Sequence, residues 1–131
     1  MEPERVVEVH VERPYAEVLA FMGDPTKLPM WAAGIGAVVE LSEGRWHADS
    51  PMGRIVVEFV PGNPPGVLDH TLTLESGHVM RNRAAVTPDG AGARCRYLVR
   101  QRPGTSDEEF DRDEAAVRAD LESLRRVLEE G

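Results

Sequence analysis

The sequence predicts an α+β fold in which seven antiparallel strands form one sheet that wraps around a long C-terminal helix. Two observations predict the sheet. Apolar residues recur at every second position over most of the chain, and short turns rich in glycine and proline separate these runs. A third observation predicts the helix, because apolar residues recur every three or four positions over 106–129.

The N-terminal part of the chain predicts one strand followed by two short helices. Over 5–12, valines at alternate positions form an apolar face opposite charged and polar residues, which is typical of a half-buried strand. A proline then ends this strand, and the spacing of apolar residues over 15–22 predicts an amphipathic helix. A second short helix is predicted over 26–31, with Leu28 and Trp31 on one face so that Trp31 packs this helix onto the sheet.

Six further strands are predicted between the short helices and the C-terminal segment. Their apolar residues alternate with polar ones, and the breaks between them contain glycine, proline or the hairpin signal Asp-Gly. The predicted strands cover 35–41, 45–50, 55–59, 67–74, 79–86 and 94–101. Consecutive strands joined by short turns form an antiparallel meander, which can have one buried face and one solvated face.

The last predicted element is the long helix. Ser106 precedes Glu109 by three residues, the arrangement of a capping box, and thus marks the first turn. The apolar stripe that follows consists of Phe110, Val117, Leu121, Leu124 and Leu128. No other predicted element is long enough to cover the buried face of the sheet.

Length and composition indicate a single domain over 1–131 and exclude several classes of protein. The net charge is −8 and Lys27 is the only lysine, so the chain lacks the clustered positive charge of a nucleic-acid-binding protein. Cys95 is the only cysteine, which excludes an intramolecular disulfide. The polar N-terminus lacks a signal peptide's apolar stretch, and no apolar run has the length of a membrane span. We therefore expect a cytoplasmic protein with no membrane span.

Three segments carry a resemblance to a known family: DPTKLPMW at 24–31, GVLDH at 66–70 and TSDEEF at 105–110. With the order of the predicted elements, they make the whole chain resemble the START-like (helix-grip, SRPBCC) superfamily, in particular its polyketide cyclase/dehydrase and lipid-transport branch. The resemblance implies a deep apolar cavity between the sheet and the long helix. Members of this family bind lipids, hormones and polyketides, and some catalyse cyclisation or dehydration.

His70 is the candidate catalytic residue. It alternates with the apolar residues Leu68, Leu72 and Leu74 along the predicted strand, so its side chain lies on the same face as theirs and is predicted to point inward. An imidazole titrates near neutral pH and can act as a general acid or base. The alternative interpretation is a histidine that is hydrogen-bonded within the core.

The candidate ligand-binding residues lie at inward positions of the predicted strands. Asn82 has apolar neighbours of the same parity, and Tyr97 lies between inward positions of the last strand, so each needs a hydrogen-bond partner that is either structural or part of a ligand. The complete predicted set is Trp46, Phe59, His70, Met80, Asn82 and Tyr97. The four histidines do not form a metal-binding pattern, and no phosphate or dinucleotide motif is present, so we predict neither a metal nor a cofactor.

Three functions are consistent with these patterns. The first is binding of a small, largely apolar molecule, such as a lipid, a polyketide or an aromatic metabolite, between the sheet and the C-terminal helix. The second is a cyclase or dehydratase in which His70 moves a proton while Asn82 or Tyr97 orients a carbonyl. The third is a protein-interaction module. The predicted partner is the small ligand, and the sequence leaves open a homodimer.

Overall fold

The structure is a computed structural model and describes residues 3–131. Seven strands form one antiparallel sheet in the order β1-β7-β6-β5-β4-β3-β2. Their bounds are β1 Glu4–Val11, β2 Val39–Ser42, β3 Arg45–Ser50, β4 Gly53–Phe59, β5 His70–Leu74, β6 Val79–Asp89 and β7 Gly92–Arg100. The predicted seven-stranded antiparallel sheet is confirmed.

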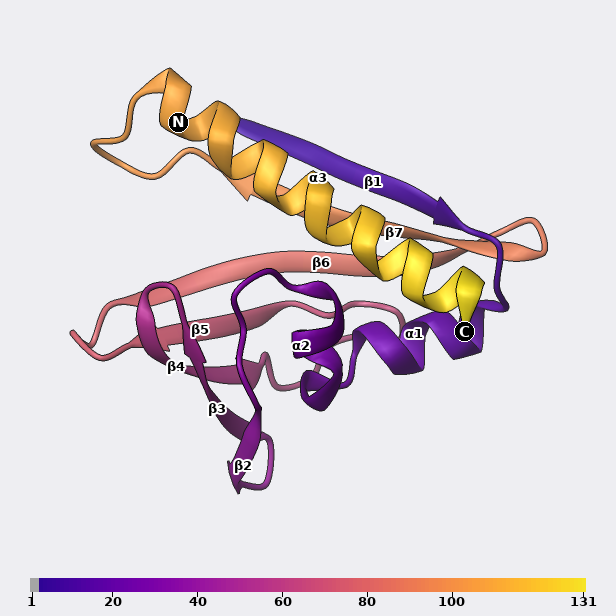
Figure 1. Ribbon diagram of the computed structural model, residues 1–131, viewed down its shortest axis with the longest axis horizontal. Coiled ribbons are helices and arrows are strands. Elements are labelled where there is room, and N and C mark those ends of the chain that lie inside the picture. The colour runs from indigo at the N-terminus through magenta and orange to yellow at the C-terminus, as the bar shows by residue number, and fades with distance from the viewer. Residues whose placement is uncertain (1–2) are drawn as a thin grey trace.

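The helices also have the predicted order. Helix α1 (Tyr15–Met22), a 3₁₀ turn η1 (Pro25–Lys27) and helix α2 (Leu28–Trp31) lie between β1 and β2, and helix α3 (Asp107–Glu130) follows the last strand. Figure 1 shows α3 running along β1 and β7, the strands that it contacts. Helix α1 packs on β6 and β7, and α2 packs on α3. In residues 3–131, no helix is long and apolar enough to span a membrane.

The first turn of α3 has the predicted capping box. The Ser106 hydroxyl accepts a hydrogen bond from the Glu109 backbone N–H at 3.1 Å, and the Glu109 carboxylate accepts one from the Ser106 N–H. Of the predicted apolar stripe, four residues are buried in the core, whereas Val117 is only half-buried. Val117 borders a cavity, described below.

The predicted strand over 35–41 is too long at its N-terminal end. Strand β2 begins at Val39, and Gly34 adopts φ 78°, a left-handed conformation that turns the chain. Ile35 and Val38 instead pack against the small buried cluster formed by Ala48, Ile55 and Val57. Ile35 and Val38 are therefore apolar residues of a loop that cover this cluster, and they are not part of a strand.

The predicted strand over 67–74 is interrupted before His70. The Leu68 N–H donates to the Ala84 carbonyl, as expected for two paired strands. The Ala84 N–H, however, donates to Oδ1 of Asp69, and the Leu68 carbonyl accepts from the His70 ring instead. Two side chains thus take the place of one backbone hydrogen bond, which is why β5 begins at His70.

Candidate functional site

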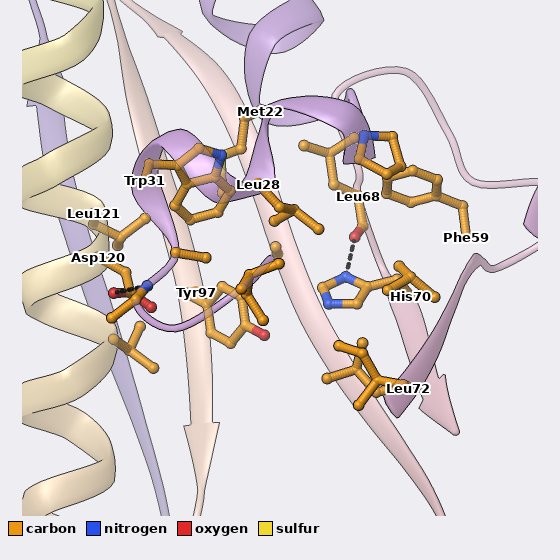
Figure 2. A pocket seen from close by; sticks show the side chains of 18 residues that line it. Met22, Leu28, Trp31, Phe59, Leu68, His70, Leu72, Tyr97, Asp120 and Leu121 are labelled. Atoms are coloured by element: carbon orange, nitrogen blue, oxygen red, sulfur yellow. Dashed lines mark hydrogen bonds between the residues drawn. The ribbon is translucent and has the colours of Figure 1, made fainter. Parts of the chain in front are cut away.

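A cavity of about 200 Å³ lies between the sheet and the helices α2 and α3. Its walls come from β4, β5, β6 and β7 on one side and from 22–35 and α3 on the other. Figure 2 shows the 18 lining side chains, of which all but three carry apolar or indole groups. The three polar side chains are His70, Tyr97 and Asp120.

His70 points into the cavity from the start of β5. Its Nδ1 donates to the Leu68 carbonyl at 2.9 Å, which leaves Nε2 as the acceptor in the neutral ring. The Asn82 amide nitrogen lies 3.4 Å from Nε2 and can donate to it. Burial lowers the pKa of His70, against the raising effects of the Leu68 carbonyl and the Asp69 charge. The ring is therefore neutral near pH 7, with a lone pair at Nε2.

Asp69 does not form a catalytic pair with the adjacent His70. Its carboxylate contacts β6 instead, where Oδ1 accepts from the Ala84 N–H at 3.1 Å and Oδ2 lies 3.9 Å from the Arg83 guanidinium. The partners of the His70 ring within residues 3–131 are the Leu68 carbonyl and the Asn82 amide, and neither is a carboxylate. Its capacity for proton transfer thus depends on the groups inside the cavity.

Tyr97 lines the same cavity as His70. Figure 2 shows its hydroxyl pointing toward the His70 ring, and the two ring centroids are 6.2 Å apart. Phe59 extends the aromatic wall, with its centroid 6.1 Å from that of His70. The hydroxyl forms no hydrogen bond to any residue in 3–131. Burial and the negative charge of Asp120 both raise the pKa of Tyr97, so the phenol stays neutral and can donate or accept.

Asp120 is a site residue that the sequence analysis missed. It is half-buried on α3, and its Oδ1 accepts a hydrogen bond from the Ala33 N–H at 3.1 Å. Burial raises the pKa of Asp120, while the bond from Ala33 lowers it. Asp120 lies three residues after Val117 and next to Leu121, which are both lining residues. This spacing is the signal that would have placed it beside the apolar stripe.

Trp31 closes the cavity from α2 and is buried, with 9% of its surface exposed. This agrees with the predicted packing role. Its indole N–H is enclosed and has no hydrogen-bond partner within the described part of the chain.

The structure brings together only part of the predicted ligand-binding set. Phe59, His70 and Tyr97 line the cavity, whereas Trp46, Met80 and Asn82 do not. Trp46 packs edge-on against Phe59 with centroids 6.3 Å apart. Met80 pairs with Leu72 across the sheet, and Asn82 reaches the cavity only through His70. The three residues outside the lining thus support the cavity walls.

Side chains suited to a metal do not gather in residues 3–131, where no group of three or more His, Cys, Asp or Glu residues has the required proximity. Cys95 is fully buried in the core, and burial raises the pKa of its thiol to about 12. The thiol is therefore protonated and inert as a nucleophile. The chemistry available at the site consists of one neutral imidazole, one phenol and one carboxylate.

Comparisons with known proteins show the fold. No family model matches the sequence, and no curated protein matches it. Among solved structures, DynU16, a protein in the dynemicin biosynthetic locus, superposes with a TM-score of 0.71 at 19% identity, covering 96% of this chain and 47% of DynU16. This chain thus spans about half the length of DynU16.

Two other solved structures share the fold over nearly the whole chain. CalU16 from Micromonospora echinospora has a TM-score of 0.68 at 16% identity and covers 97% of this chain and 74% of CalU16. A conserved protein from Geobacillus kaustophilus has a TM-score of 0.76 at 12% identity, covering 98% of this chain and 96% of that protein. These likenesses, at low identity, are consistent with the helix-grip fold that the sequence resemblance implies.

Proposed function

We propose that this protein binds a small, largely apolar molecule in the cavity between the sheet and α3, and that it belongs to the polyketide cyclase/dehydrase and lipid-transport branch of the helix-grip proteins. The observation that carries the proposal is the apolar cavity with three polar side chains. Ligand sites are typically apolar concavities with a few placed polar groups. The origin of DynU16 in a biosynthetic locus supports a role with a small organic molecule.

The size of the cavity limits the ligand. At about 200 Å³, the cavity is smaller than the usual pocket for a drug-sized molecule. An apolar protein cavity of roughly 150 Å³ holds a benzene molecule. We therefore propose a ligand with one or two rings. A larger lipid would require the walls to move apart.

The experiment is calorimetric titration with 2-naphthol, using two matched variants. Ala84 lines the cavity, whereas Ala85 is the next residue on the opposite face of β6. Ala84→Leu fills part of the cavity and should weaken binding roughly tenfold or more, which corresponds to ~1.4 kcal/mol. Ala85→Leu should bind like the parent. Absence of binding by the parent, or equal binding by the three proteins, would contradict the proposal.

A second candidate function is acid–base catalysis by His70. The observation that favours it is the neutral imidazole of His70 in the cavity lining, with its ring centroid 6.2 Å from that of Tyr97. Such a ring can take a proton from a carbon next to a carbonyl and return it, while the phenol donates to the carbonyl oxygen. This pair would suit an enolisation step of a cyclic ketone.

Exchange of deuterium from D₂O into the α-carbon of 2-tetralone tests this second function. NMR should show faster exchange with the parent than with buffer, and His70→Gln should lose this acceleration while still binding the ketone. Glutamine keeps a hydrogen-bonding group but does not titrate in this range. Exchange no faster than in buffer, or unchanged in His70→Gln, would leave binding as the function.

A further inference from the structure

The cavity contains one formally charged side chain, the carboxylate of Asp120, and no lysine or arginine among its lining residues. Asp120 forms no ion pair within residues 3–131. None of the four arginines of α3 lines the cavity, and two of them have other carboxylate partners, because Arg118 pairs with Glu114 and Arg125 pairs with Glu122 and Glu129. The cavity thus offers a negative group that no neighbouring positive charge compensates.

The two oxygens of Asp120 have different surroundings. Oδ1 accepts from the Ala33 N–H at 3.1 Å, whereas Oδ2 has no hydrogen-bond donor within the described residues. A buried or half-buried carboxylate is stabilised by additional donors. The free Oδ2 is therefore a position where a donor group on a ligand gains a charge-assisted hydrogen bond.

A second polar group of the cavity, the hydroxyl of Tyr97, complements the Asp120 carboxylate. Figure 2 places Asp120 beside α3 and His70 beside β5, with the Tyr97 ring between them. The Tyr97 hydroxyl has no hydrogen-bond partner within residues 3–131 and can donate or accept, so it suits a hydroxyl or a carbonyl oxygen. The rest of the lining is aromatic and aliphatic.

We infer that the ligand is an uncharged ring molecule that carries a hydroxyl group, that this hydroxyl donates to Oδ2 of Asp120, and that the same carboxylate excludes ligands bearing a carboxylate or phosphate. The inference rests on the proposed binding function and narrows its ligand class. An anionic ligand would lose its hydration on entering the apolar cavity without gaining a positive partner, and it would meet a like charge. A fatty acid or a phospholipid headgroup is therefore disfavoured.

The test uses three probes that share one ring system: naphthalene, 2-naphthol and 2-naphthoate. Titration calorimetry near pH 7.5 should give an affinity for 2-naphthol that is roughly tenfold or more above that for 2-naphthoate. Asp120→Asn keeps an oxygen for the Ala33 N–H and removes the charge. This variant should bind 2-naphthol several-fold more weakly than the parent does. The difference between its affinities for 2-naphthol and 2-naphthoate should also be smaller than in the parent.

Asp113→Asn is the matched control. Asp113 lies two turns earlier on α3, pairs with Arg102 at 3.2 Å and does not line the cavity, so its change alters the net charge equally. It should leave both affinities unchanged. Two outcomes would overturn the inference while leaving the binding function intact. One is equal affinity of the parent for 2-naphthol and 2-naphthoate, and the other is equal affinities of Asp120→Asn and Asp113→Asn for these probes. Failure of all three probes, naphthalene included, would overturn the binding function and the inference with it.

Discussion

Truncating two neighbouring leucines of α3 should destabilise the protein by different amounts. Leu121 and Leu124 are both fully buried, but only Leu121 borders the cavity. Each change to alanine removes three carbon atoms, worth about 2.4 kcal/mol at ~0.8 kcal/mol per buried methylene. At Leu124 the truncation also leaves an empty space in the packed core, which costs further free energy. The total loss of unfolding free energy should therefore reach ~3–5 kcal/mol. At Leu121 one side already lacks partner atoms, so Leu121→Ala should cost about 1 kcal/mol less.

Urea unfolding followed by tryptophan fluorescence measures both losses, with Glu122→Ala as the control on the outer side of the helix. Glu122 pairs with Arg125 at the surface, where such a pair contributes less than about 1 kcal/mol. The slope of unfolding free energy against urea should stay the same in all variants. A cost at Leu121 equal to or above that at Leu124, or a similar cost at Glu122, would refute the packing described for α3.

Three further predictions follow from single side chains. His10 bonds to Asp89 and Glu12, each at 2.7 Å, and these bonds raise its pKa. The stabilisation by His10 is therefore complete below its unfolded pKa of about 6.5 and is lost as the pH rises through its higher folded pKa. His10→Gln should thus lower the free energy of unfolding more at about pH 5.5 than at about pH 8.5. An equal loss at the two pH values would contradict this. Cys95 should resist a thiol reagent in the native state and react in denaturant, and native reactivity would show that its burial is wrong. Ser106→Ala should cost ~0.5–2 kcal/mol in a thermal or urea melt, and no loss would show that the cap is unimportant.

Side-chain direction along the strands was predictable from the sequence. The period of a strand is two, so the parity of Leu68 and Leu72 is enough to turn His70 inward, and the same rule turns Tyr97 inward. The order of elements was also predictable, because turns rich in glycine and proline separate the runs. The interruption at Asp69 was not predictable, because it depends on a side chain competing with the backbone for the Ala84 N–H.

The extent of the cavity along the buried face was not predictable. Trp46 and Met80 were expected to line it, because their parity turns them toward the helices, but parity does not tell how far α2 and α3 extend over the sheet. Asp120 was missed for a related reason. An acidic residue beside an apolar stripe usually faces solvent, and its partner Ala33 is far away in the sequence.

NMR mapping of 2-naphthol on ¹⁵N-labelled protein tests most directly whether the cavity is the binding site. Saturating ligand should shift the indole N–H of Trp31 and the backbone amides of Ala33, Leu68 and Ala84, which surround the cavity. Amides of β2, which lies at the far edge of the sheet, should not move. Shifts confined to β2 or to the outer face of the sheet, or no shifts at saturation, would contradict binding between the sheet and α3.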